Sequence, residues 1–102
     1  MTVLYVQFRD LAVAEIGPWT VRVRGRDPKD GCLIGTFVGT GPYDHFAWRH
    51  YAKQDAVQVR YHKRAREAAA RDAVTLPRDG FVSIPADLDR ARFWSLIRQH
   101  KA

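Results

Sequence analysis

The sequence predicts a single α+β domain in which an antiparallel sheet is covered by two or three helices. Three observations predict this class: a hairpin pattern over 19–38, a helix-favouring stretch that ends near residue 72, and an amphipathic segment after Pro85. A chain of 102 residues has the size of one domain, so we expect 1–102 to fold as a unit. With 46% hydrophobic and 12% aromatic residues, the composition excludes a disordered or fibrous chain.

The N-terminal part is expected to supply the first strands of the sheet. Residues 2–8 combine β-branched and aromatic side chains and predict a strand, whereas 10–16 fit either a short strand or one helical turn. An edge strand of so small a sheet can pair with a second copy of the chain, which makes a homodimer an open alternative.

The clearest local pattern is a β-hairpin over 19–38. Polar residues alternate with apolar ones between positions 19 and 25, which is the period of a half-buried strand. A turn that contains Pro28 and Gly31 follows, and the apolar segment 32–38 returns as the second strand.

The segment 43–72 is expected to form two helices, 43–53 and 56–72. Its last third is rich in alanine and arginine, which favour helix. One unbroken helix would extend about 45 Å, which is long for a domain with a radius of gyration of about 13 Å. We therefore expect a break near Asp55, which can cap the second helix. Residues 56–62 also alternate like a strand, and a strand there is the alternative.

The last quarter of the chain predicts a small hairpin over 74–84 and a closing helix. Two short apolar stretches flank a Pro-Arg-Asp-Gly turn, and Pro85 then suits the first position of a helix. Asp87 and Asp89 would lie in the first turn, where the positive end of the helix dipole favours carboxylates. The apolar arc that docks on the core consists of Phe93, Trp94, Leu96 and Ile97.

The charge is positive and concentrated in the second half. Seventeen basic and eleven acidic residues give a net charge of +6. Residues 1–50 contain six basic and five acidic side chains, whereas residues 51–102 contain eleven basic and six acidic ones. Arginine outnumbers lysine thirteen to four, and its planar guanidinium suits phosphate. Alanine is equally frequent, so a GC-rich genome is a competing explanation for the arginine excess. An isoelectric point near 10 points to nucleic acid, DNA or RNA, as the partner.

These observations lead to the hypothesis of a small accessory or regulatory protein that binds nucleic acid through its phosphate backbone. Alternation places three arginines of the hairpin on one face, and helical spacing places others on one side of 56–72. The competing interpretation is an ordinary solvated surface with local ion pairs. The proposed contact residues are Arg22, Arg24, Arg26, Arg49, Lys53, Arg60, Lys63, Arg64 and Arg71.

Two other function classes stay open. The chain could be an interaction module that inhibits or regulates an acidic or nucleoprotein partner, with exposed rings as anchors at Trp48, Tyr51 and Trp94. It could also be a small metal-independent nuclease that uses His45 or His50, although no spacing in the sequence demands catalysis.

Several classes of site are not expected. Cys32 is the only cysteine, which excludes an internal disulfide and an all-cysteine metal site, and its place in a predicted apolar strand suggests a buried, inert thiol. The loop 39–42 lacks the lysine and spacing of a P-loop. We expect no cofactor and no metal. No apolar run of about 18 residues and no secretory leader is visible, so a cytoplasmic protein without a membrane span is expected.

Overall fold

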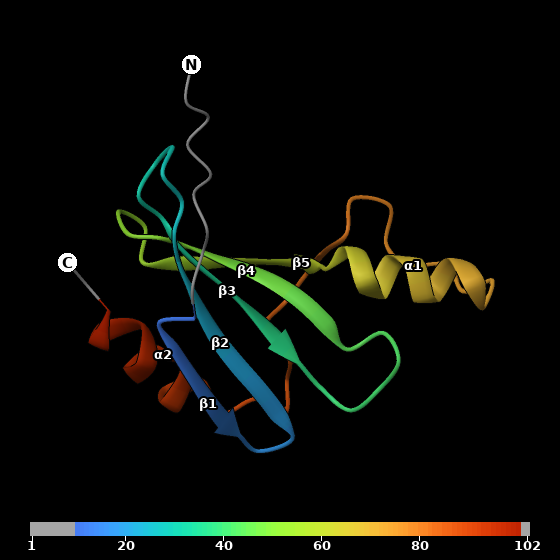
Figure 1. Ribbon diagram of the computed structural model, residues 1–102, viewed down its shortest axis with the longest axis horizontal. Helices are drawn as coiled ribbons and strands as arrows, with labels where there is room; N and C mark the ends of the chain where they lie inside the picture. Colours follow the sequence, from blue (N-terminus) through green and yellow to red (C-terminus); the bar gives the residue numbers. More distant parts are fainter. Residues whose placement is uncertain (1–9, 101–102) are drawn as a thin grey trace.

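The computed structural model describes residues 10–100 and shows an antiparallel six-stranded sheet with two helices, as the α+β prediction required (Figure 1). The strand order β1-β2-β3-β4-β5-β6 follows the sequence, so the sheet is a meander. The predicted strand 2–8 lies outside the described residues. The elements are β1 (Ala12–Ile16), β2 (Trp19–Arg26), β3 (Leu33–Val38), β4 (His45–Tyr51), β5 (Ala56–Tyr61), α1 (Lys63–Arg71), β6 (Phe81–Val82) and α2 (Arg90–Gln99).

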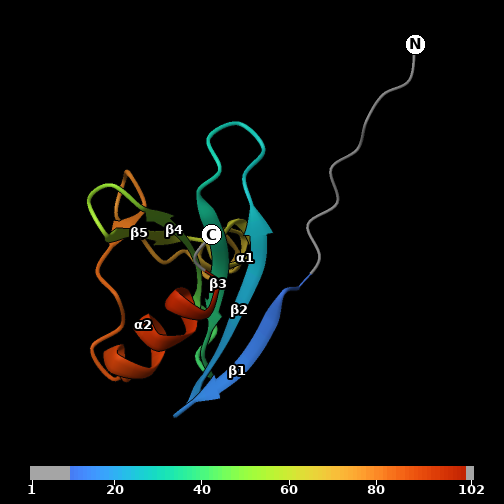
Figure 2. The same cartoon turned by 90° about the vertical axis from the view of Figure 1, so that its left-hand side faces the viewer.

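Helix α2 lies beside one face of the sheet (Figures 1 and 2), and the core is packed between them. Phe93 of α2 is fully buried, and its ring centroid lies 5.0 Å from that of Phe37 and 5.3 Å from that of Trp48. Helix α1 instead extends outward from the end of β5 (Figure 1). Alternate residues of the strands supply most of the rest of this core, among them Val21, Val23, Leu33, Phe46 and Val59.

The predicted hairpin over 19–38 is confirmed as β2 and β3, which pair antiparallel. Its turn is closed by the Asp27 amide, which donates to the carbonyl of Cys32 over 2.8 Å, and by Gly31, whose φ of +73° favours glycine. Cys32 therefore lies half-buried in the turn before β3 and not inside the strand, which corrects the expectation of a buried thiol.

The predicted helix 43–53 is wrong, because residues 45–51 form strand β4. Phe46, Trp48 and His50 point to the core and the residues between them face the other side, which is the period of a strand. Aromatic side chains fit this pleated, half-buried position well. The edges of β3 and β5 hydrogen-bond β4 on both sides, so sheet pairing decides a segment that locally resembles an amphipathic helix.

The predicted helix 56–72 is correct only in its second half. Ala56–Tyr61 form strand β5, the alternative drawn from their alternation, and α1 spans Lys63–Arg71. Asp55 does not cap a helix; it occupies the β4–β5 turn with a φ of +47°. The cap of α1 is His62, whose ring nitrogen Nδ1 accepts a hydrogen bond from the Arg64 amide over 3.1 Å.

The predicted hairpin 74–84 is wrong in its first strand. The Val74 amide donates to the Ala69 carbonyl over 2.8 Å and so closes the end of α1, which leaves it no part in a ladder. Only Phe81–Val82 form a strand, and they pair with β5.

The closing helix begins later than Pro85. Asp89 caps it, because its carboxylate accepts from the Arg92 amide over 3.2 Å. Asp87 instead accepts a hydrogen bond from the Trp19 indole over 2.9 Å, which ties the segment before α2 to β2.

Because Phe93 fills the space between α2 and the sheet, we expect Phe93→Ala to lower the free energy of unfolding by about 3–5 kcal/mol. The matched control is Phe81→Ala, because Phe81 is 44% exposed. Among the aromatic and cation–π contacts of the described residues, its ring takes part in one, with the Arg60 guanidinium 5.1 Å from the ring centroid. The control should lose about 1 kcal/mol or less. Urea denaturation of both variants measures the difference, and equal losses would contradict this packing.

Candidate functional site

A hollow of about 770 Å³ opens on the sheet face opposite α2. The strands β2, β3, β4 and β5 supply most of its lining, and the first turn of α1 adds one residue. Its cationic lining consists of Arg22, Arg24, Arg49, Arg60 and Arg64. The basic residues of the hairpin and those of the middle of the chain, far apart in the sequence, therefore converge on one surface.

Strand register arranges the lining in three rows that cross the sheet. The first row runs through Val38, His45 and His62. The second row runs through Arg22, Thr36, Ala47 and Arg60. The third row contains Ile34, Arg49 and Gln58, and Arg24, which has no partner in the register, lines the hollow from the bulge of β2. Arg22, Arg24 and Arg60 thus come from β2 and β5, which flank the hollow. Between them β3 and β4 supply a floor of smaller and apolar residues, to which β4 also adds His45 and Arg49.

Arg26 does not share the face of Arg22 and Arg24, which corrects the prediction from simple alternation. A β-bulge at Arg24 shifts the register between Val23 and Gly25, and Arg26 then pairs with the core-facing Leu33. Its guanidinium donates to the carbonyl of Gly31 and to the carbonyl of His100 at the end of α2. Arg26 therefore links the hairpin turn to the helix on the other side of the sheet.

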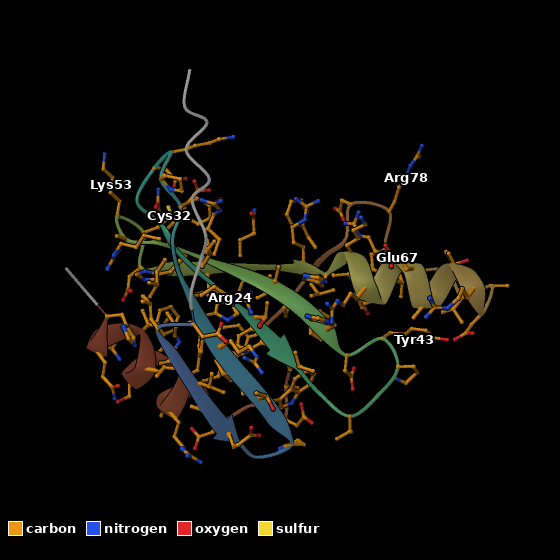
Figure 3. All side chains as sticks on the ribbon, viewed as in Figure 1. Arg24, Cys32, Tyr43, Lys53, Glu67 and Arg78 are labelled. Carbon is orange, nitrogen blue, oxygen red and sulfur yellow. The ribbon has the colours of Figure 1, made fainter. Side chains whose placement is uncertain are left out.

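Three further predicted contact residues lie outside the lining of the hollow. Lys53 lies at the tip of the β4–β5 turn (Figure 3). Lys63 is 84% exposed on α1, with its amine 3.8 Å from the Glu67 carboxylate. Arg71 belongs to the last turn of α1. The sequence predicts that Arg60 lies on the same side of a helix as these basic residues of 56–72. It does not, since Arg60 is in strand β5.

Carboxylates neutralise part of the cationic lining. Arg22 and Arg24 share Asp10, at 2.5 and 3.1 Å. Arg49 lies 2.5 Å from Asp27 and 2.7 Å from Asp30. Among the described residues, Arg60 and Arg64 form no ion pair. Five arginines against three aspartates leave a net charge of +2. The two arginines without a carboxylate, Arg60 and Arg64, lie at the side of the hollow formed by β5 and α1.

The ion pairs of Arg49 fasten the β2–β3 turn to β4. The hydrogen bond from Arg49 is the main cause of a lowered pKa at Asp27, and the Lys29 amide lowers it further. At Asp30 the backbone amide of Cys32 is the largest cause of the lowered pKa, and the charge of Arg49 adds to it. Arg49 is only 28% exposed, so it is first of all a structural residue of the rim.

Two histidines stack at one end of the hollow, although no local pattern in the sequence pairs them. The rings of His45 and His62 are nearly parallel, 7° apart, with centroids separated by 4.0 Å. The His62 amide donates to the His45 carbonyl over 2.8 Å, because β4 and β5 run side by side here. The pairing of β4 with β5 therefore brings together two rings that lie 17 positions apart in the sequence.

Both stacked rings favour the neutral form. Burial is the main cause of the lowered pKa of His45, and the positive charge of His62, Arg64 and Arg24 lowers it further from 6.5. Burial also dominates the lowered pKa of His62, with Arg64 and Arg24 acting in the same direction and Glu67 in the opposite one. At neutral pH the hollow therefore presents two uncharged rings between arginines.

The aromatic residues expected as surface anchors do not form an exposed patch. Trp48 is 2% exposed and belongs to the core, which corrects its assignment as an anchor. Trp94 is half-buried against His50, with ring centroids 5.8 Å apart, and the half-buried Tyr51 donates from its hydroxyl to Gln58. His50 is buried on the α2 face, so it shares no site with His45.

Other site classes find no support between residues 10 and 100. This part of the chain contains no group of three His, Cys, Asp or Glu side chains that could hold a metal ion. None of its helices is long and apolar enough to span a membrane. In the loop 39–42 the Asp44 carboxylate accepts from the Gly41 amide over 2.9 Å, so that amide already has an anionic partner.

Comparison with known protein families, with curated proteins and with solved structures found no match, so the chemistry of the hollow must be argued from its own geometry.

The ion pairs of Arg49 predict an acid-sensitive stability. Because the pKa values of Asp27 and Asp30 are lowered by folding, their contribution is complete above the unfolded value near 3.8 and is lost as the pH falls through the folded values. Urea midpoints measured between about pH 2 and 5 should fall less steeply with acid in Arg49→Met than in the unmodified protein. Arg60→Met, which removes an arginine without an ion pair, is the control and should keep the original steepness. Parallel curves for Arg49→Met and the unmodified protein would refute the linkage.

Proposed function

We propose that the protein binds nucleic acid through the arginine-lined hollow on the open face of its sheet. The observation that supports this most is the convergence of five arginines from β2, β4, β5 and α1 on one concave surface. Guanidinium groups bind phosphate oxygens through two parallel hydrogen bonds, and several of them together fit a repeating polyanion.

The distribution of partners in the hollow favours an external anion. A guanidinium without a carboxylate loses no ion pair when it contacts phosphate, and Arg60 and Arg64 have no carboxylate partner among the described residues. Arg22 and Arg24 share a single carboxylate, so one positive charge of that pair is not compensated. The proposed contact residues are therefore fewer than the sequence suggested. Four of the residues expected from the sequence do not line the hollow: Arg26, Lys53, Lys63 and Arg71.

The interaction-module alternative draws less support. An anchor residue at a protein interface is a ring exposed before binding, and Trp48 is buried. An acidic protein could still be attracted to the arginines, and the binding experiment must include it.

The proposal is tested with a matched pair of variants on one helix. Arg64 lines the hollow and Arg71 does not, so Arg64→Gln should weaken binding of a labelled RNA oligonucleotide and reduce the salt slope by about one, while Arg71→Gln should leave both nearly unchanged. Fluorescence anisotropy between about 50 and 200 mM salt measures both quantities. Equal effects of the two variants would remove the hollow as the site. Tighter binding of poly-glutamate than of RNA would favour the acidic-protein alternative instead.

The stacked histidines predict that binding strengthens in acid. In the free protein, burial and the surrounding cations lower the pKa of His45, whereas a bound phosphate favours the imidazolium. Binding should therefore take up protons, and the dissociation constant should fall as the pH drops from about 7.5 to 5.5 at constant ionic strength.

His45→Gln tests the origin of this effect. The variant should show a flatter pH dependence, and His100→Gln, beyond the end of α2, is the control that should retain it. An unchanged pH profile in His45→Gln would show that another group takes up the proton.

A further inference from the structure

The floor of the hollow differs chemically from its walls. Ile34, Val38 and Ala47 are half-buried there and carry no charge. Beside them, the Thr36 hydroxyl has no hydrogen-bond partner within residues 10–100. A ligand that neutralised only the arginines would leave this apolar floor against water, so the surface fits a ligand with an anionic periphery and a flat, apolar interior.

The walls and the floor are spaced for a narrow ligand. The charged residues Arg22 and Arg60 stand at the two ends of one row, with only Thr36 and Ala47 between them. Three strand spacings separate β2 from β5, about 14 Å across a flat sheet. The volume of about 770 Å³ is within the range of small-molecule pockets, roughly 300–1,000 Å³. That space admits a few nucleotides.

A duplex does not match this surface. The bases of a double helix are stacked inside it, and only its phosphates and groove edges are accessible. A protein element that reads the major groove must project into a space about 12 Å wide. The open face is instead hollowed, with the arginines around its floor, so a duplex lying across it would reach the arginines and leave the floor unused.

The stacked histidines add a platform for an unpaired base. His45 and His62 form a two-ring stack, with ring centroids 4.0 Å apart. Bases of single strands stack on aromatic rings, including histidine, and on guanidinium planes. Arg24 and Arg64 act electrostatically on both rings, so a base on the stack would place its phosphates beside these cations.

We propose that the hollow selects single-stranded nucleic acid, with bases against the floor and the histidine stack and with phosphates at the arginines. This inference rests on the proposed nucleic-acid binding. Ribose and deoxyribose strands share the chemistry that the site recognises, so the experiment includes both.

The test compares four probes of one sequence, about a dozen nucleotides long: single-stranded RNA, single-stranded DNA, and the duplex of each. We expect at least tenfold tighter binding of a single strand than of its duplex, measured by fluorescence anisotropy at one salt concentration. A duplex bound as tightly as its strands would overturn the single-strand inference and leave the proposed function standing. Binding of none of the four would overturn the proposed function itself.

A variant that fills the floor without changing charge separates stacking from electrostatics. Ala47→Leu places a larger side chain between Arg22 and Arg60, and it should reduce single-strand binding about tenfold with little effect on residual duplex binding. Ala91→Leu makes the same change at an exposed position of α2 and should bind like the unmodified protein. Circular dichroism and the urea midpoint identify a variant that fails to fold, in which case Ala47→Val provides the smaller filling. Equal loss of strand and duplex binding in a folded floor variant would contradict a base-contacting floor.

Discussion

The alternation of side chains between the two faces of the sheet is the constraint on which the rest of the structure depends. In β4, Trp48 faces the core and its neighbour Arg49 faces the hollow. A slip of one residue would exchange these environments along the whole strand. Gly35 fixes the position of Trp48, because a side chain at 35 would overlap the indole and the Arg22 carbonyl. The register that packs the core is therefore the same register that gathers the arginines.

The core and the hollow are linked in a second way, through residue size. The Trp48 indole lies against the backbone at Gly35, on the α2 side of the sheet, while Ala47 and Thr36 keep the other side shallow. The bulge at Arg24 changes which face the following residues point to. Arg26 therefore points toward α2, while Arg24 stays over the hollow. This one bulge thus affects both faces of the sheet. Arg26 connects the hairpin turn to α2, and Arg24 lines the hollow.

The sequence contained enough information for some elements and not for others. The β2–β3 hairpin and the body of α1 could be predicted because alternation and alanine content are local signals. Strand β4 could not, since its apolar residues satisfy helical spacing as well as alternation, and pairing with β3 and β5 decides between them. The charge pattern identified all five arginines of the hollow, but it could not reveal the His45–His62 stack or the reversal of Arg26, which depend on strand pairing.

The carboxylates that pair with the arginines of the hollow are distributed unequally, so its two sides differ in how strongly they attract an anion. On the β2 side Asp10 holds Arg22 and Arg24, and on β4 two aspartates hold Arg49. Such ion pairs at a half-exposed surface are weak, but they fix where a guanidinium points and reduce its gain from a new anion. Arg60 of β5 and Arg64 of α1 carry no such compensation among the described residues, and Arg64 acts electrostatically on both rings of the histidine stack. A polyanion therefore gains most free energy at the β5–α1 wall, and the paired arginines opposite it contribute orientation more than attraction.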